Sequence, residues 1–250
     1  GLNLVNLNQL AAETYQEGNL NNAVIHQTGD YNEASQEQTG DFNSSNISQD
    51  GNFNETDVIQ DGNKNSSNLL QEGNKNHAFS KQEGSRNVTS LEQKGNKNSF
   101  QATQKGKQNN VVSKQYGNKN YIDLLQSESE NMADLLQDGN KNVINALQEG
   151  AGNQLIVRQI GRANDAEIKQ YGDGNSAEVW QYSKNNVTQI EQKGNNNIAY
   201  SMQKGLRNNT IIQSSGEENL AVAMVTEGNQ NNIGIYQNGN NNSGSVYLEA

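Results

Sequence analysis

Few residues of this chain have a type and spacing suited to catalysis or metal binding. Cysteine is absent, which excludes thiolate metal sites and disulfide bonds. His26 and His77 are the only histidines and lie 51 residues apart, so we expect them to be surface polar residues. The glycine-rich segment 172–174 lacks the Lys-Ser/Thr and the following helix that a phosphate loop needs. The sequence therefore predicts no enzyme, no cofactor and no metal site.

The residues that do recur at fixed spacing are glutamine and asparagine, whose chemistry is amide hydrogen bonding. Residues 71–76 read Gln-Glu-Gly-Asn-Lys-Asn, and the pattern Gln-x-Gly-x-x-Asn returns every 11 residues from Gln16 onward. Of 21 such units, all have Asn at the sixth place, 19 open with Gln and 19 have Gly at the third place. An internal repeat of this kind decides the fold before any local feature does.

A few units depart from the pattern. Ser214 and Thr226 replace the opening Gln, while Glu128 and Ser183 replace the Gly and predict arcs of altered geometry. One extra residue enters near Val225, which we interpret as a bulge or a lengthened arc. These positions indicate local changes in a repeat that otherwise keeps its phase.

The secondary structure that positions the amides is predicted from the alternation of small or aliphatic residues with variable polar residues. After Asn21, the side chains two and four places on are Ala23 and Ile25, and the next Gln is Gln27. Variable, often charged residues stand between them. Alternation is the period of a strand, and a Gly in every unit would cost a helix about 1 kcal/mol each. Each unit is therefore expected to form a strand of about seven residues and a tight arc at its glycine.

Two units return the chain to its starting side. We therefore predict an all-β fold, a two-sheet parallel β-solenoid with coils of 22 residues and two 11-residue units in each coil. Each residue then stacks on the residue 22 places later. About 10 coils spaced by roughly 4.8 Å make a rod on the order of 50 Å long.

In such a stack every amide lies between identical amides. Donors meet acceptors along the axis, which offsets the cost of burying them. We predict two Gln ladders and two Asn ladders, represented in the middle of the chain by Gln71, Asn76, Gln82, Asn87, Gln93, Asn98, Gln104, Asn109, Gln115, Asn120, Gln137 and Asn142. The arc glycines of the same region are Gly73, Gly84, Gly95, Gly106, Gly117 and Gly139.

Lysines with the coil spacing predict an exposed basic column on one arc. The column consists of Lys75, Lys97, Lys119 and Lys141. We interpret it as a solvated edge, with lateral contact to an acidic arc of another filament or to an anionic matrix polymer as the alternative.

The sequence divides into two segments. Residues 1–15 are a degenerate first unit or a docking segment, because Leu10 replaces the Asn and apolar residues such as Leu2 and Leu7 are frequent. Residues 16–250 form the solenoid of about 21 half-coil repeats. The chain begins at Gly1 rather than Met, which we interpret as processing or trimming.

Composition narrows the function classes. The formal net charge is −10 and only 31% of residues are hydrophobic. An acidic chain without a basic face is a poor nucleic-acid binder, and no run of 18 apolar residues is present to insert into a membrane. A polar composition alone fits disorder, but a disordered chain has no reason to keep a strict period.

Growth on a template follows from the repeat. The strand and amide hydrogen bonds of a coil exist only against a neighbouring coil, so an isolated coil should be unstable. Neither proline nor a helix-like or bulky cap follows the last unit before Ala250. We expect the open coil to pair with another copy, and a head-to-tail contact that does not close gives a filament.

The motif Gln-x-Gly-x-x-Asn-x-Ala resembles the curlin repeat, and residues 16–23 and 170–177 carry it in full. The resemblance extends from residue 16 to about residue 246 and implies a subunit of curli, the extracellular functional amyloid fibres of bacterial biofilms. It also implies a secreted homopolymer at the cell surface, surface adhesion, and two partners: a nucleator subunit and an outer-membrane secretion channel. The chain has more repeats than familiar members and therefore resembles an enlarged major fibre subunit.

A soluble monomeric β-solenoid that binds a glycan or an ice surface is the alternative. Such a protein presents a flat array of one side-chain type, whereas the outward positions here are mixed. An enzyme on a β-helix needs long loops at one edge of its coils, and 19 units run here without an insertion. The repeat therefore favours a structural protein.

Overall fold

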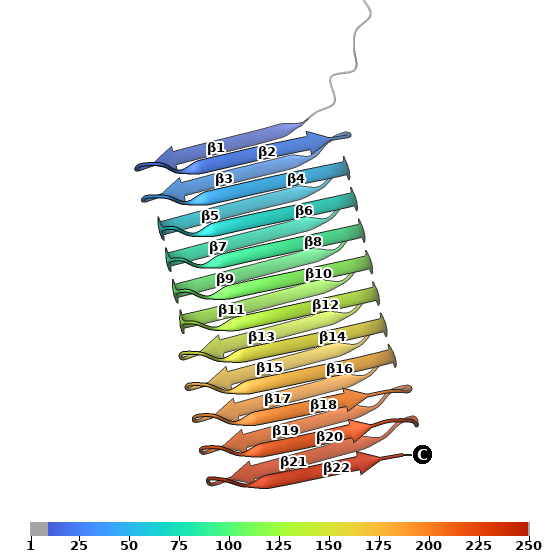
Figure 1. The fold of residues 1–250 in the computed structure, drawn as a ribbon. Coiled ribbons are helices and arrows are strands. Elements are labelled where there is room, and N and C mark those ends of the chain that lie inside the picture. Colours follow the sequence, from blue (N-terminus) through green and yellow to red (C-terminus); the bar gives the residue numbers. More distant parts are fainter. Residues whose placement is uncertain (1–9, 250) are drawn as a thin grey trace, which may run out of the picture.

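The chain forms 22 β-strands in this computed structural model, which describes residues 10–249. Side chains alternate between inward and outward positions along these strands. The odd-numbered strands form one sheet of 11 strands and the even-numbered strands form another (Figure 1). All pairs are parallel, so one strand of each sheet and two arcs make a coil. The predicted all-β, two-sheet parallel β-solenoid with 22-residue coils is confirmed.

The strands are short and similar in length. The first sheet contains β1 (Ala11–Glu17), β3 (Glu33–Thr39), β5 (Glu55–Asn63), β7 (His77–Ser85), β9 (Ser99–Lys107), β11 (Tyr121–Ser129), β13 (Val143–Glu149), β15 (Asp165–Tyr171), β17 (Val187–Lys193), β19 (Asn209–Ser215) and β21 (Asn232–Asn238). The second contains β2 (Asn22–Thr28), β4 (Ser44–Asn52), β6 (Ser66–Asn74), β8 (Val88–Asn96), β10 (Asn110–Asn118), β12 (Met132–Asn140), β14 (Gln154–Arg162), β16 (Ser176–Lys184), β18 (Ile198–Gln203), β20 (Leu220–Val225) and β22 (Ser243–Leu248).

Three side chains of each strand point between the two sheets. In β8 these are Thr89, Leu91 and Gln93, all buried, whereas Ser90 and Glu92 point outward and are partly exposed. The middle inward position stacks into an aliphatic column in each sheet, and burial of one such side chain contributes about 1.5–3 kcal/mol. In the second sheet the column includes Ile47, Leu69, Leu91, Leu135, Val157 and Val179.

Each arc contains two residues with left-handed backbone, where the sequence indicated one. Gly95 has φ 120° and Lys97, two places on, has φ 59°. The N–H of Lys97 donates to the carbonyl of Asn74 in the preceding coil at 3.0 Å. The hydrogen-bonded ladder therefore continues around the arc instead of stopping at the end of the strand.

The extra residue near Val225 lengthens one arc. Val225 is aligned with Gln203 in the register of β18 and β20, so the insertion lies between Val225 and Gly228. The expectation that Thr226 opens this unit is wrong, because Val225 occupies the inward place that Gln holds in other coils.

Glu128 and Ser183 also have left-handed backbone, with φ 74° and 82°. Pairing between β11 and β13 ends at Ser127, one residue before Glu128. Pairing between β16 and β18 ends at Gln181, two residues before Ser183. Both residues therefore adopt the backbone conformation that glycine has in other arcs, at places where the ladder to the following coil is not continuous.

The segment before Gln16 contributes to the first coil. β1 begins at Ala11 and pairs in parallel with β3. The apolar residues Leu2 and Leu7, on which the docking interpretation depends, lie outside the described residues.

Candidate functional site: amide ladders and open end coils

Buried glutamines form two hydrogen-bonded ladders along the solenoid axis. The Nε2 of Gln71 donates to Oε1 of Gln93 at 2.9 Å, and Gln93 donates in the same way to Gln115 at 2.7 Å. The second proton of Gln93 Nε2 goes to the carbonyl of His77 in the opposite sheet, at 3.1 Å. Each side chain thus joins two coils and two sheets, and its polar atoms are paired inside the protein. The same contacts are made by Gln82, Gln104, Gln115 and Gln137.

The asparagines differ from the amide-to-amide stack expected from the sequence, because they bond mainly to the backbone of the following coil. Oδ1 of Asn76 accepts from the N–H of Asn98 at 3.0 Å, and Nδ2 of Asn76 donates to the carbonyl of Gly95 at 2.9 Å. A direct contact between the two amides, from Asn98 to Asn76 at 3.2 Å, is additional. The shorter side chain therefore fixes the arc of the next coil. The same backbone contacts are made by Asn87, Asn98, Asn109, Asn120 and Asn142.

The arc glycines lie where two coils approach most closely. A Cβ built on Gly95 would overlap the carbonyl oxygen of Gly117 in the next coil, and a φ of 120° disfavours a side chain independently. A glycine is therefore required both by its own backbone and by its neighbour. The same overlap, with the carbonyl of the next arc, holds for Gly73, Gly84, Gly106, Gly117 and Gly139.

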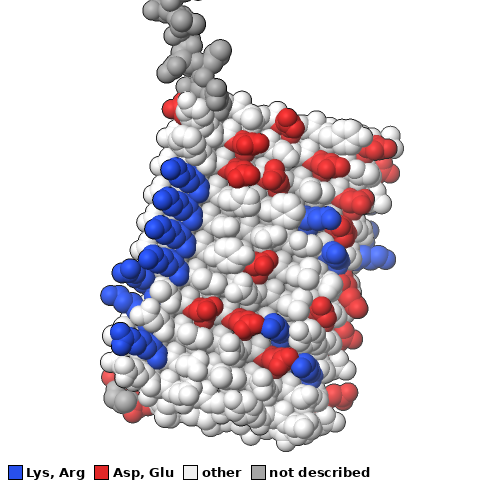
Figure 2. Space-filling view, turned by 180° about the vertical axis from the view of Figure 1, so that it is seen from behind, with Lys and Arg blue, Asp and Glu red and all other residues white. Residues whose placement is uncertain are grey.

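The four lysines of the basic column stand at the second left-handed position of successive arcs and are exposed. Figure 2 shows them as a regular row along one edge of the rod. Among residues 10–249 none of the four forms an ion pair.

Paired charges lie instead on the sheet faces. Lys94 contacts Glu92 at 2.8 Å and Glu72, one coil earlier, at 3.4 Å. Its hydrogen bond lowers the pKa of Glu92 below the ordinary value. Exposed pairs of this kind contribute about 1 kcal/mol or less.

Sequence reasoning missed a third kind of amide ladder, on the outside of one arc. Asn74 Nδ2 donates to Asn96 Oδ1 at 3.1 Å, and the contact repeats from Asn96 to Asn118 and from Asn118 to Asn140, both at 3.0 Å. The signal was present in the sequence as an Asn directly after the glycine of successive coils. Its exposure made it indistinguishable from a solvated arc residue.

The Gln ladder of the second sheet ends at Gln203, two coils before the last strand of that sheet. Val225 and Leu248 occupy the next two Gln positions after Gln203. The Nε2 of Gln203 donates to Oγ1 of Thr210 at 3.0 Å instead. The carboxyl-terminal end of this ladder is therefore apolar.

Within residues 10–249 the first and last coils leave strand edges open. β1 and β21 are the two edges of the first sheet, and β2 and β22 are the edges of the second. Thr14, at an inward place of β1, is exposed, and Oε1 of Gln16 and Gln27 accept no hydrogen bond within residues 10–249. At the other end, Nε2 of Gln237 donates to a carbonyl of its own coil, that of Asn242, at 3.1 Å.

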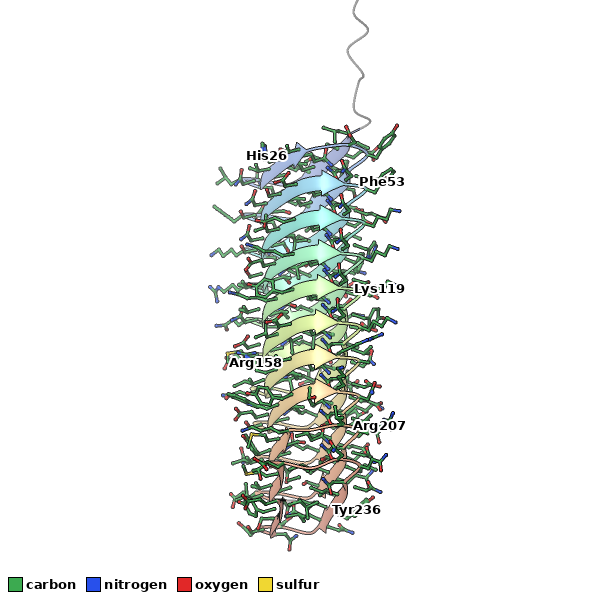
Figure 3. The ribbon with its side chains drawn as sticks, turned by 90° about the vertical axis from the view of Figure 1, so that its right-hand side faces the viewer. His26, Phe53, Lys119, Arg158, Arg207 and Tyr236 are labelled. Carbon is green, nitrogen blue, oxygen red and sulfur yellow. The ribbon has the colours of Figure 1, made fainter. Side chains whose placement is uncertain are left out.

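Residues 10–249 contain no group of three or more His, Cys, Asp or Glu placed to hold a metal ion. Nor does this part of the chain include a helix with the length and apolar character needed to span a bilayer. His26 lies exposed on β2 (Figure 3) and His77 is partly exposed at the start of β7. The arrangement found here can pair strand edges and amides with another molecule.

Comparison with known proteins bears on the repeat itself. A protein-family model described as the curlin associated repeat matches residues 8–40 and 161–192. A comparison with curated proteins finds no match. The two matched segments keep one register of Gln, Gly and Asn, and that register also runs through the coils between them. The chain thus contains segments that match the curlin associated repeat.

Proposed function

We propose that this chain is a structural, non-enzymatic subunit of an extracellular curli-like fibre, which grows when the first coil of one copy stacks on the last coil of another. The observation that carries the proposal is the position of the open edges: β1 and β21 bound one sheet, and β2 and β22 bound the other. Parallel pairing of β1 with β21 of a second copy repeats the contact made by every interior strand. Exposed strand edges of this kind are templates for another chain.

The side chains of the two ends also fit one another. Extending the register places Gln16 on Gln237 and Thr14 on Ile235. The Gln237 amide can then exchange its bond to Asn242 for Oε1 of Gln16, as interior glutamines do. One Gln ladder thus continues across the junction.

Each added copy covers one open coil and presents an identical one. Such a contact does not close, so it gives a filament. For a curli-like fibre we further expect secretion from a bacterium through an outer-membrane channel, nucleation by a second subunit, and roles in the biofilm matrix and in adhesion. The curlin associated repeat and the open end coils support this assignment.

Seeded assembly tests the proposal. Purified chain should form fibres after a lag that preformed fragments abolish, and the fibres should diffract near about 4.8 Å and about 10 Å. Thr14→Lys places an ammonium group against Ile235 of the neighbouring copy, where it is buried without a partner. Elongation should slow by roughly tenfold or more, measured by dye fluorescence and electron microscopy.

Tyr15→Lys is the matched control, because Tyr15 is the next residue of β1 and points outward. It adds the same charge and should elongate at nearly the original rate. A wild-type chain that stays monomeric with seeds, or equal inhibition by both variants, contradicts head-to-tail stacking.

A further inference from the structure

Seven basic side chains in seven successive coils lie along one edge of the solenoid, five at the second left-handed position of the arc and two one residue before it. The basic stripe is defined as Lys75, Lys97, Lys119, Lys141, Arg162, Lys184 and Arg207. Figure 2 shows it as a blue band, and Figure 3 shows Lys119 and Arg207 on the same edge as Phe53. With coils about 4.8 Å apart the stripe is roughly 29 Å long.

The charges of the basic stripe are not neutralised by the protein. No stripe residue forms an ion pair with a carboxylate of residues 10–249, whereas Lys81 and Lys169 on the sheet faces do. Lys119 is flanked by Tyr116 and Tyr121. A chain with net charge −10 thus places 7 of its 18 basic residues in one line. A row of unpaired like charges raises the local concentration of anions.

Three carboxylates do lie beside the stripe. Glu72, Asp138 and Asp165 stand on the strands next to Lys75, Lys141 and Arg162, without forming an ion pair with any of them. The part from Lys97 to Lys119 has no acidic neighbour in either adjacent column. The middle of the stripe is therefore its most strongly anion-attracting part.

Aromatic rings continue the same column toward the amino-terminal end. Tyr31 and Phe53 stand at the arc position of Lys75 in the two preceding coils, and their rings stack with centroids 4.9 Å apart and an interplanar angle of 5°. Both are about half exposed, at 51% and 52%. The Lys75 ammonium lies 5.6 Å from the centre of the Phe53 ring. A flat apolar surface thus adjoins the row of cations.

We propose that the basic stripe and the Tyr31–Phe53 pair bind an extended polyuronate, an acidic polysaccharide that lies along the solenoid axis. Each sugar carries one carboxylate for a cation of the stripe, and the apolar face of a sugar ring packs on an aromatic ring. The surface lies on a single chain, so the proposal does not rest on fibre formation. In a fibre the same surface recurs in every copy.

Two other occupants fit the geometry less well. Duplex DNA carries one charge per about 1.7 Å and its strands wind away from a straight row. A second copy of the chain would need a complementary acidic row, and no outward column of residues 10–249 has acidic residues in more than two successive coils.

Binding of an oligogalacturonate to monomeric chain tests the proposal. Binding is measured on freshly purified chain in the Thr14→Lys background, in which elongation is expected to be slow, so failure of binding and failure of fibre growth are separate results. Lys97→Gln, Lys119→Gln and Lys141→Gln together should weaken binding by roughly tenfold or more and reduce its dependence on salt. Glutamine is structurally matched, because Gln108 and Gln230 occupy the same arc position elsewhere.

The control removes three charges from other surfaces. Lys107→Gln, Lys114→Gln and Lys169→Gln change the net charge equally and should leave the affinity within about twofold. Tyr31→Asn with Phe53→Asn should weaken binding without changing its salt dependence, and Asn185 and Asn241 show that Asn fits this position.

Each remaining outcome overturns the proposal. Equal binding of the methyl-esterified oligomer shows that carboxylates are not recognised. An equal loss of binding affinity in the two triple variants shows that the basic stripe is not the binding site for the oligogalacturonate. Binding of single-stranded DNA as tight as that of the uronate assigns the stripe to polyanions in general.

Discussion

Gly95 and Gly152 both have positive φ, but they stand at different places of the arc. Gly95 holds the first left-handed position, where the next coil approaches most closely, and Gly152 holds the second. Nothing lies within 4 Å of a Cβ built on Gly152. Other coils carry Lys97 or Asn196 at that second position. The two glycines therefore differ both in crowding and in backbone conformation, with φ 120° at Gly95 and 68° at Gly152.

Gly95→Ala should lower the free energy of unfolding by about 2–4 kcal/mol, because the new methyl group forces two arcs apart and φ of 120° is strained for alanine. Gly152→Ala should cost about 1 kcal/mol. Denaturant unfolding of monomeric chain measures both. Equal losses of unfolding free energy in the two variants would show that the close contact between neighbouring arcs contributes little to stability.

Asp123, on the outward side of β11, introduces a dependence of stability on pH. Burial raises the pKa of Asp123 above its ordinary value. The folded chain then binds this proton more tightly than the unfolded chain, so stability falls as pH rises from about 4 through the raised folded pKa. Above that window the ionised carboxylate destabilises the fold.

Asp123→Asn should raise the unfolding midpoint at neutral pH, flatten its pH dependence across this window, and have little effect at about pH 3, where Asp123 is protonated. Midpoints measured over a pH series test this. Asp61→Asn, at an exposed position of the same sheet, is the control. A lower midpoint for Asp123→Asn at neutral pH would contradict the assignment.

At the scale of elements, the Gln ladders connect strands that are 22 residues apart and also connect the two sheets. Gln93 accepts from Gln71, donates to Gln115 and donates to the backbone of β7. Removing one amide therefore leaves partners unpaired in two other coils. The loss of stability therefore arises in several coils of the ladder and not in one strand alone.

Gln93→Leu should lower the free energy of unfolding by about 2–5 kcal/mol, because a buried donor of Gln71 and a buried acceptor of Gln115 lose their partner. Lys97→Leu, on the exposed arc of the same coil, should change it by about 0.5 kcal/mol or less. Leu20 already occupies that arc position in another coil. Comparable losses in the two variants would contradict the energetic role of the ladder.

Strand positions could be predicted from the sequence because Gln, Asn and Gly each occupy one phase of the repeat. The second left-handed position could not, because residues as different as Leu20, Phe42, Lys64 and Glu218 occupy it. There the backbone is fixed by its hydrogen bond to the preceding coil and not by residue type. The place of Val225 was missed for a related reason: pairing with β18 sets the register, whereas counting from the next glycine shifts it by one residue.

The candidate site could be predicted only in part. The amide positions of Gln93 and Asn98 followed from the period, but their hydrogen-bond partners did not. Both residues carry the same functional group, and only the length of the side chain decides whether it reaches the next amide or the backbone of the arc. Sequence spacing does not contain that distance.

At the scale of the whole molecule, the sheets keep one direction of chain and one spacing from β1 to β22 (Figure 1). The two sheets are therefore continuous along the rod within residues 10–249, and their unpaired strand edges lie at its two ends. This arrangement explains why a polar chain with 31% hydrophobic residues forms an ordered core: amide hydrogen bonds between coils supplement a narrow aliphatic column.

The Gln-to-Gln hydrogen bonds of both ladders point the same way, from Nε2 of one coil to Oε1 of the coil that follows it. Their dipoles therefore add along the rod instead of cancelling. One tip offers carbonyl oxygens at Gln16 and Gln27, and the opposite tip offers the Gln237 amide at one end of its coil and the apolar Leu248 at the other. An arriving subunit meets a different chemical surface at each tip, so a polymer of this chain should have a fast and a slow extremity and should not anneal through two like tips.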